Sequence, residues 1–594
     1  MEVALPIIGL LGQCYSGAIQ AYLFIQDAVD FPDTAAKLVI QLEVERIRLQ
    51  LWGRNSGADS DALHPGLAPF EPLILDILTK VKELLGDSDK LKADYGLVSS
   101  MDGSVQLDKN RPVDQIKDVF RCALAFAAPE RRKKAKGTSD STTPPSLPAV
   151  SQDALARKTY ERIRWVVVSK SRFEALIADL RRLTNNLNEL LRESQLVHLS
   201  QQWHSIELQA VAHTDDQQVL SALQEAVEGD ENSRDISSMA RRKSIIISPR
   251  DLDVPKSGTK VLSKDDFELP TDFATISRCI AVYRPLLLPD QQSYVLIERK
   301  HYDGDISPEN KATLLFRLHN LIELVNSPPS EYLFCLGYWS EPQANCWCLV
   351  FKFPLQGITP EPSKDLSTPL SSQPLSLLLF LSSDAFRPPL EARLTLACTL
   401  AGVFSRFYGS KWLHKGVRSE NIVFPGSTYD IAHPLVAGFE YSRQATAPVS
   451  IDRAPDDRAQ AIYRHPRYQG PAAYGYRMAY DIYSFGLVLA EIAWWVPLES
   501  FLRAVPRKGG KAAAAAADKE TGFGAEEASE LKRMVIARLR KELAFRVGTT
   551  YKEVVEWCLT TGDAPSTLSD ADLAVAFYTK VVVPLQNISA GQIL

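Results

Sequence analysis

The chain has 594 residues, of which 45% are hydrophobic and 23% charged, and its formal net charge is −5 at pH 7. A chain of this length is too long for one hydrophobic core, so we expect two or three domains. The composition is that of folded globular proteins. The small negative charge excludes a global basic field that would attract nucleic acid, and we expect no nucleic-acid partner.

The eight cysteines are scattered, and only Cys346 and Cys348 lie close together. Strand alternation would place these two thiols on the same face. Because no other Cys or His stands at ligand spacing, we expect reduced core thiols in a cytosolic protein and no metal site.

The N-terminal segment from Val3 to Gln26 contains no charged residue. It is long enough to cross a bilayer, but polar side chains recur at helical spacing and form a stripe on one face. A constitutive anchor is therefore disfavoured, and two interpretations stay open. The segment is either a core helix whose polar stripe faces solvent or a conditionally membrane-active helix. The residues that carry the second interpretation are Ile7, Gly9, Gly12, Gln13, Ser16 and Gln20.

Residues 1–225 have the apolar spacing of successive helices. A second helix carries Ile40, Val44, Ile47 and Leu51 and is predicted to end at Gly53. A third is predicted to stop near Gly86, and the longest is predicted near residues 172–199. Apolar stripes of this kind bury only against each other, so residues 1–225 are predicted to form an all-α helical bundle.

Three polar segments interrupt this pattern. Residues 129–150 form a basic insert, which is either a solvated loop, an electrostatic tether for anionic lipid headgroups or a nuclear localisation signal. The lipid-contact candidates are Arg131, Arg132, Lys133, Lys134 and Lys136. Residues 226–265 are predicted to be an interdomain linker, in which Ser244 follows three basic residues as in a kinase substrate site. Residues 505–528 are predicted to be a low-complexity surface insertion.

The segment from Trp412 to Phe424 resembles the catalytic loop of protein kinases. The spacing from His414 to Asn421 matches that of the kinase motif H-R-D-L-x-x-x-N. About sixty residues later, the segment beginning at Asp481 resembles the kinase helix whose buried Asp holds that loop. The resemblance implies that residues 266–594 have an α+β protein-kinase-like fold. We expect Asp481 to be buried and to accept hydrogen bonds from the backbone near His414.

The residues needed for phosphoryl transfer are missing from this region. Gly416 stands where the Asp that positions the substrate hydroxyl would be, and Gly438 stands where the metal-binding Asp would be. The segment from Phe273 to Tyr294 has no glycine, so no glycine-rich loop can approach phosphates. Glu298 occupies the lysine position of the third strand, and Lys300 follows two residues later. We therefore expect a pseudokinase with no enzymatic activity, no bound cofactor and no metal. Its vestigial kinase positions are Lys300, His414, Gly416, Asn421, Gly438 and Asp481.

The N-terminal bundle resembles the HeLo domain of fungal prion-inhibition and incompatibility proteins. The resemblance rests on the glycine-punctuated start at Ile7–Gly12, on Leu49–Gly53, and on the block around Trp165 that leads into Phe173–Leu191. The pairing with a dead kinase is similar in architecture to mixed-lineage kinase domain-like proteins.

This resemblance implies programmed cell death or heterokaryon incompatibility signalling. The bundle would permeabilise membranes once its first helix is released, with membrane lipids, an upstream activator and a second copy of the chain as partners. The protein would be cytoplasmic and would move to the plasma membrane when activated. The alternative is a pseudokinase scaffold that binds protein partners and never enters a membrane.

Overall fold

The computed structural model describes residues 5–30, 36–60, 62–100, 118–121, 124, 164–167, 169–227, 233–247, 260–285, 292–327, 333–353, 373–425, 430–439, 443–444, 458–469, 476–503, 523–563 and 568–591. The chain divides into two compact units, Met1–Ser237 and Ser238–Leu594. The helix α10 (Arg234–Ile247) contains the division between them.

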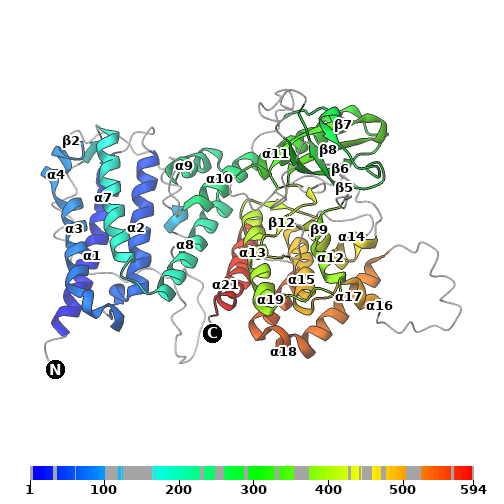
Figure 1. The fold of residues 1–594 in the computed structure, drawn as a ribbon. Helices are drawn as coiled ribbons and strands as arrows, with labels where there is room; N and C mark the ends of the chain where they lie inside the picture. Colours follow the sequence, from blue (N-terminus) through cyan, green and yellow to red (C-terminus); the bar gives the residue numbers. More distant parts are fainter. Residues whose placement is uncertain are drawn as a thin grey trace, which may run out of the picture. The chain divides into compact units, whose positions relative to one another are not determined.

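The N-terminal unit is mainly helical. Its helices are α1 (Leu5–Ala28), α2 (Ala36–Ser56), α3 (Glu71–Gly86), α4 (Ser88–Ala93), α7 (Lys170–Asn188), α8 (Glu193–His213) and α9 (Gln217–Val227). Helices α1, α2, α3 and α7 lie side by side (Figure 1). Their shared core includes the fully buried Tyr22, Trp52 and Phe173. The indole Nε1 of Trp52 donates to the Leu187 carbonyl at 2.9 Å, which ties α2 to α7.

The prediction of an all-α bundle is corrected by a small sheet. The strands β1 (Val29–Asp30), β2 (Leu97–Ser100) and β3 (Arg164–Val167) pair in the order β1-β3-β2. The block around Trp165 is thus a strand that leads into α7. Strands of two to four residues are too short to show a period of two, so the sequence pattern could not reveal them.

Three predicted boundaries are also corrected. Helix α2 does not stop at Gly53 but continues to Ser56. The long helix predicted near residues 172–199 is two helices, because the chain turns between the end of α7 at Asn188 and the start of α8 at Glu193. The predicted linker at 226–265 contains α10, in which Arg242 and Lys243 are fully buried. Ser244 therefore lies on a helix and not in an extended kinase-substrate segment.

The C-terminal unit begins with a five-stranded antiparallel sheet in the order β4-β5-β6-β8-β7. Its elements are β4 (Phe267–Glu268), β5 (Arg278–Tyr283), β6 (Ser293–His301), α11 (Pro308–Val325), β7 (Cys335–Glu341) and β8 (Cys346–Lys352). Helix α11 connects β6 to β7. In the register of β5 and β6, Arg278 lies directly opposite Glu298.

Helices dominate the rest of this unit. They are α12 (Leu377–Ser382), α13 (Leu390–Gly409), α14 (Arg458–Ala461), α15 (Met478–Trp494), α16 (Glu499–Arg503), α17 (Ala525–Arg538), α18 (Ala544–Val547), α19 (Thr549–Thr560), α20 (Asp570–Phe577) and α21 (Val583–Ser589). The short strands are β9 (Leu375–Ser376), β10 (Trp412–Leu413), β11 (Ile422–Phe424), β12 (Leu435–Val436) and β13 (Arg443–Gln444). Helix α17 includes residues 525–528, so these four residues do not belong to the predicted surface insertion.

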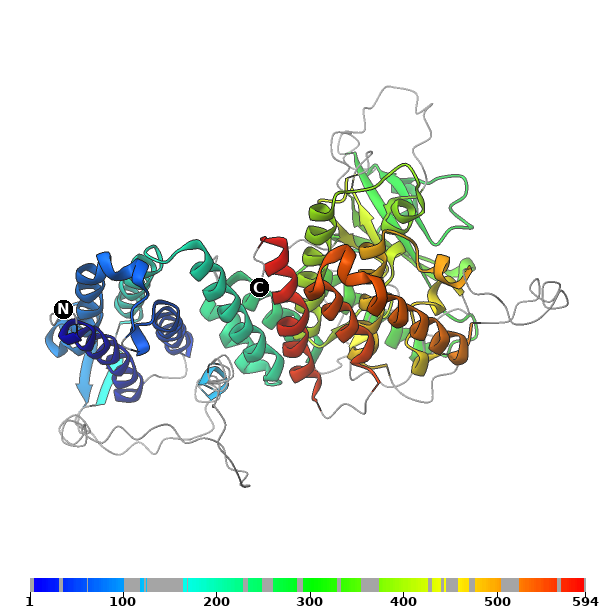
Figure 2. The same cartoon turned by 90° about the horizontal axis from the view of Figure 1, so that it is seen from below.

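Helix α15 is the centre of this helical part, and every one of its residues is buried. A Cβ added at Gly486 would lie 2.7 Å from the Cβ of Cys558, so this glycine permits the close approach of α15 and α19. On another side of the unit, α21 packs beside α13, as both views show (Figure 2). The loop between β10 and β11 begins next to the start of α15, and it contains most of the candidate site.

Candidate functional site

Asp481 holds this loop in place. It is fully buried at the start of α15 and accepts hydrogen bonds from the backbone N–H groups of His414 (2.7 Å) and Lys415 (2.9 Å). The Tyr476 hydroxyl also donates to it. The predicted burial and backbone contacts of Asp481 are therefore confirmed. Burial raises the pKa of Asp481 to about 6, although the three donors act in the opposite direction.

His414 shapes the loop from inside the core. Its Nδ1 accepts from the Gly416 N–H at 3.2 Å, so Nε2 must carry the ring proton, and Nε2 lies 3.0 Å from the Ala437 carbonyl. Burial lowers the pKa of His414 to about 3, so the ring is neutral at physiological pH. His414 is thus a hydrogen-bonding residue of the core.

The carboxamide of Asn421 occupies the space between the two glycines. Its Nδ2 donates to the Gly416 carbonyl at 2.7 Å, and its Oδ1 accepts from Arg278 Nη2 at 2.7 Å. A Cβ at Gly438, where φ is +81°, would lie 2.2 Å from Asn421 Nδ2. An Asp at position 438 would therefore collide with this carboxamide. Both ends of the Asn421 side chain already have partners within the protein.

A buried carboxylate faces the same glycine. Glu298 accepts from the Gly438 N–H at 2.7 Å and from Arg278 Nε at 2.9 Å. The side chain of Glu298 is 1% exposed and that of Arg278 is 12% exposed. We call these four residues, Arg278, Glu298, Asn421 and Gly438, the arginine clamp. The clamp joins β5 and β6 of the sheet to the loop before β11 and to the segment after β12.

The clamp includes one residue that the sequence prediction missed. Arg278 interrupts an apolar strand, and Glu298 interrupts the next one. Two opposite charges in consecutive apolar strands are the signal that could have revealed their pairing. Lys300 is also buried, at 4% exposure, but in the described part of the chain the ion pair of Glu298 is made by Arg278 and not by Lys300.

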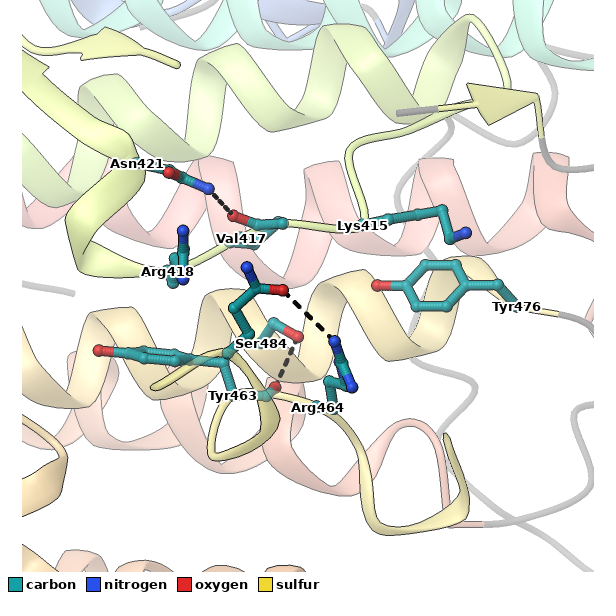
Figure 3. Close-up of a pocket in the computed structure, with 10 residues that line it drawn as sticks. Lys415, Val417, Arg418, Asn421, Tyr463, Arg464, Tyr476 and Ser484 are labelled. Atoms are coloured by element: carbon teal, nitrogen blue, oxygen red, sulfur yellow. Dashed lines mark hydrogen bonds between the residues drawn. The ribbon is translucent and has the colours of Figure 1, made fainter. Parts of the chain in front are cut away.

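A small pocket lies beside the loop, at the start of α15 (Figure 3). Its side chains include Lys415, Arg418, Arg464, Tyr463, Tyr476 and Ser484. The ammonium of Lys415 lies 5.3 Å from the centre of the Tyr476 ring. The cavity volume is about 20 Å³, which is enough for one water molecule but not for a phosphate. Among the residues that the structure describes, this pocket therefore has no room for a phosphate group.

Glu341, Cys346 and Cys348 form a cluster of potential metal ligands in the described part of the chain, with their ligand atoms within 4.8 Å of one another. Cationic side chains already contact this cluster. Arg299 Nη2 lies 3.8 Å from Cys346 Sγ, and Lys264 pairs with Glu341 at 2.5 Å. The two thiols share a face, as the strand alternation predicted, but no sequence pattern indicated that Glu341 would join them.

In the N-terminal unit, α1 packs against the bundle through its apolar face, as predicted. Leu11, Ala18 and Tyr22 are buried. The polar residues Gln13, Ser16 and Gln20 are exposed, Gly9 and Gly12 are half-buried, and the side chain of Ile7 lies outside the described residues. In this state the polar stripe faces solvent. No helix in the described residues is long and apolar enough to cross a membrane.

Two contacts fasten α1 to α2. Tyr15 packs on Gly53, where an added Cβ would lie 2.3 Å from the tyrosine ring. At the other end of α1, Gln26 Nε2 donates to the buried carboxylate of Glu43 at 2.6 Å. Gly53 is thus a packing position inside α2 and not a helix terminus. The five lipid-contact candidates between Arg131 and Lys136 lie outside the described residues.

Comparison with known families concerns the N-terminal unit. Residues 3–223 match the family model HeLo, described as prion-inhibition and propagation. The N-terminal unit carries a HeLo match. This finding supports the HeLo resemblance predicted for residues 1–225, and the HeLo family is associated with prion inhibition and cell-death signalling. We call Met1–Ser237 the HeLo unit below. No curated protein matches the chain.

Proposed function

We propose that the protein is a non-catalytic cell-death or incompatibility signalling protein. Its HeLo unit permeabilises membranes on activation, and its C-terminal unit is a pseudokinase that regulates this step. The observation that carries the proposal is the HeLo match over residues 3–223. The resting protein would be cytoplasmic and would move to the plasma membrane, where lipids and further copies of the chain become its partners.

The sheet and the buried Asp481 support a protein-kinase-like fold for the C-terminal unit. The sheet has five antiparallel strands in the order β4-β5-β6-β8-β7, with α11 between its third and fourth strands along the chain. Asp481 binds the backbone of the loop that resembles the kinase catalytic loop. The sheet, the loop and helix α15, which carries Asp481, follow one another along the chain in the order expected for a kinase.

The geometry of the vestigial site supports the absence of catalysis. Phosphoryl transfer needs a carboxylate near the substrate hydroxyl and another on the metal. Gly416 and Gly438 stand at these positions, and Asn421 fills the space next to both. The acid that is present, Glu298, is neutralised by Arg278.

Purified full-length protein should therefore show no autophosphorylation and no Mg²⁺-dependent rise in melting temperature at millimolar ATP. A ligand that binds the native state must raise its stability by mass action, so this test is direct. Incorporation of labelled phosphate that disappears in Lys300→Ala would overturn the assignment.

The membrane step can be tested on α1. Liposome leakage should be caused by residues 1–237, and Gly9→Glu should abolish it. A charge in a helix that enters lipid is unfavourable, by up to about 2.5–3.5 kcal/mol at mid-bilayer. Gly86→Glu, at the exposed end of α3, is the matched control and should leave leakage unchanged. A Cβ at either glycine meets no atom within 4 Å, so both variants should fold, which circular dichroism would verify.

The alternative function is a pseudokinase scaffold that never enters membranes. The observation in its favour is the exposure of Gln13, Ser16 and Gln20, because a polar stripe on a surface helix needs no lipid to explain it. The same experiment separates the two functions. If folded Gly9→Glu protein leaks as strongly as the parent, or if the parent does not leak, α1 does not insert and the scaffold is favoured.

A further inference from the structure

A second cavity in the C-terminal unit lies where the segment before α13, the end of α15 and the helix α18 meet. Its volume is about 280 Å³, and it is lined by Arg387, Pro388, Arg393, Trp494, Trp495, Val496 and Arg546. Three of these seven residues carry a guanidinium, and none is acidic. We call this cavity the tri-arginine pocket. Neither the HeLo unit nor the vestigial kinase positions contribute to it.

The hydrogen bonds of Arg393 leave part of its guanidinium unused. In the first turn of α13, its Nη1 donates to the Ala493 carbonyl at 2.8 Å and so caps the end of α15. Its Nε is enclosed by protein and has no hydrogen-bond partner among the described residues. Burial lowers the pKa of Arg393, and the nearby charge of Arg546 acts in the same direction, whereas Tyr551 and Glu391 act in the opposite direction. A lowered arginine pKa means that the surroundings disfavour the charged form of the guanidinium.

Arg546 contributes to this effect, and together with the hydrogen bond from Arg538 its charge also lowers the pKa of Glu542, which lies four residues earlier. It is exposed on α18. Arg387 pairs with Asp384, but the carboxylate of Asp384 is fully exposed and is therefore screened by water. Capping of α15 explains Arg393 alone. It does not explain why two further guanidiniums line the same cavity.

The aromatic wall adds another unused donor. Trp495 Nε1 donates to the Phe386 carbonyl at 3.0 Å, but the buried Nε1 of Trp494 has no hydrogen-bond partner among the described residues. The guanidinium of Arg538 lies over the Trp494 ring at 5.0 Å and pairs with Glu542. The lining residues of the pocket thus carry three positive charges and no negative one, and two of them have a buried N–H group without a hydrogen-bond partner among the described residues.

We propose that the tri-arginine pocket binds the phosphate or pyrophosphate group of a small phosphorylated ligand. Such a group has only acceptors and negative charge, and guanidiniums bind phosphate oxygens through paired, charge-assisted hydrogen bonds. An anion would also relieve the repulsion between Arg393 and Arg546.

The volume limits the ligand. The cavity volume is about 280 Å³. Pockets that enclose a drug-sized ligand start at about 300 Å³. The pocket therefore accommodates a phosphoryl or pyrophosphoryl group with little else, and the remainder of the ligand would extend into solvent.

The test is calorimetric titration of full-length protein with inorganic phosphate and with pyrophosphate, together with melting temperatures in both. Pyrophosphate should bind more tightly than phosphate, because it presents more acceptors to three guanidiniums. Arg546→Gln should weaken pyrophosphate binding by about tenfold or more, the usual effect of one lost charge-assisted contact. Since Arg546 is exposed, this variant should fold as the parent does.

Lys541→Gln is the matched control, because it removes the same charge from an exposed position close by in sequence that does not line the pocket. This variant should keep the affinity of the parent. Arg387→Gln supplies a second test at the other wall and should also weaken binding. The proposal is wrong if millimolar pyrophosphate neither releases heat nor raises the melting temperature. It is equally wrong if Lys541→Gln loses as much affinity as Arg546→Gln, since binding would then reflect general surface charge.

Discussion

The arginine clamp makes a specific prediction for Arg278→Met. Methionine keeps the apolar part of the side chain and removes the guanidinium. The carboxylate of Glu298, whose side chain is 1% exposed, would then be left with backbone donors alone. Asn421 and the Glu420 carbonyl would also lose their hydrogen bonds from Arg278, at 2.7 and 3.0 Å.

The expected loss is large because the remaining charge stays buried. Removing one partner of a buried ion pair costs about 3–5 kcal/mol. With an unfolding entropy of about 2.1 cal/mol/K per residue, this loss lowers the melting temperature of a unit of this size by roughly 4–7 °C. In the double variant Arg278→Met/Glu298→Met the buried charge is gone. Stability should recover in part, but the Gly438 N–H then lacks its acceptor, which costs about 1–3 kcal/mol.

The assay is thermal and urea unfolding of the full chain, with hydrogen exchange at the Gly438 and Phe439 amides as a local probe. Both amides donate to Glu298 and should exchange faster in Arg278→Met. The control is Arg284→Met, directly after the same strand, because its partner Glu268 is half exposed and such pairs contribute less than about 1 kcal/mol. Equal melting temperatures for the two single variants would refute the clamp, as would a coupling energy near zero.

Three further predictions concern single positions. Gly53→Ala should lower stability by about 1–2 kcal/mol, because overpacking against Tyr15 outweighs the better helix propensity of alanine; a stabilised variant in urea unfolding would contradict this. Gly438→Asp should lower the melting temperature, through strain at φ +81° and the collision with Asn421, without restoring phosphate incorporation; a fully stable variant with metal-dependent ATP binding would refute this. Burial raises the pKa of Glu491 to about 7 from 4.5, so this group stabilises the fold at low pH and loses that contribution as pH rises towards 7. In Glu491→Gln the free energy of unfolding should lose a dependence on pH of up to about 1.4 kcal/mol per pH unit, which urea unfolding across this range would detect. An unchanged pH dependence would show that Glu491 does not contribute to it.

The sequence predicted the parts of the fold that rest on apolar periodicity. Helices α1 and α3 were predicted because their apolar residues recur at helical spacing. Helix α15 was predicted because the segment beginning at Asp481 resembles the kinase helix with a buried Asp. Spacing alone did not reveal the break between α7 and α8, since Leu190 and Leu191 continue the apolar stripe through the turn. Helix α10 was missed for the opposite reason. Its Arg242 and Lys243 are buried, whereas polar composition is ordinarily evidence of exposure.

The candidate site divides in the same way. Motif spacing identified His414, Asn421 and Asp481, but it did not give the partners of the Asn421 side chain. In the structure, the nitrogen of this carboxamide donates to the Gly416 carbonyl, and its oxygen accepts from Arg278. No pattern within one segment contains this information, because Arg278 lies 143 residues before Asn421. The contacts that define the clamp depend on strand pairing, which local sequence does not determine.

The arginine clamp also has a consequence for regulation under the proposed function. In an active kinase, nucleotide and metal ions connect the sheet to the catalytic loop. Here Glu298 and Arg278 make that connection with protein groups, so the connection needs no ligand. Under this proposal a nucleotide would make no contact that differs between the resting and the activated state of this unit. A ligand that binds two states equally well cannot shift the equilibrium between them. A signal that changes the pseudokinase would therefore have to act at another surface. The tri-arginine pocket is one such surface, and pyrophosphate binding that is unaffected by Arg278→Met would show that the two sites work independently.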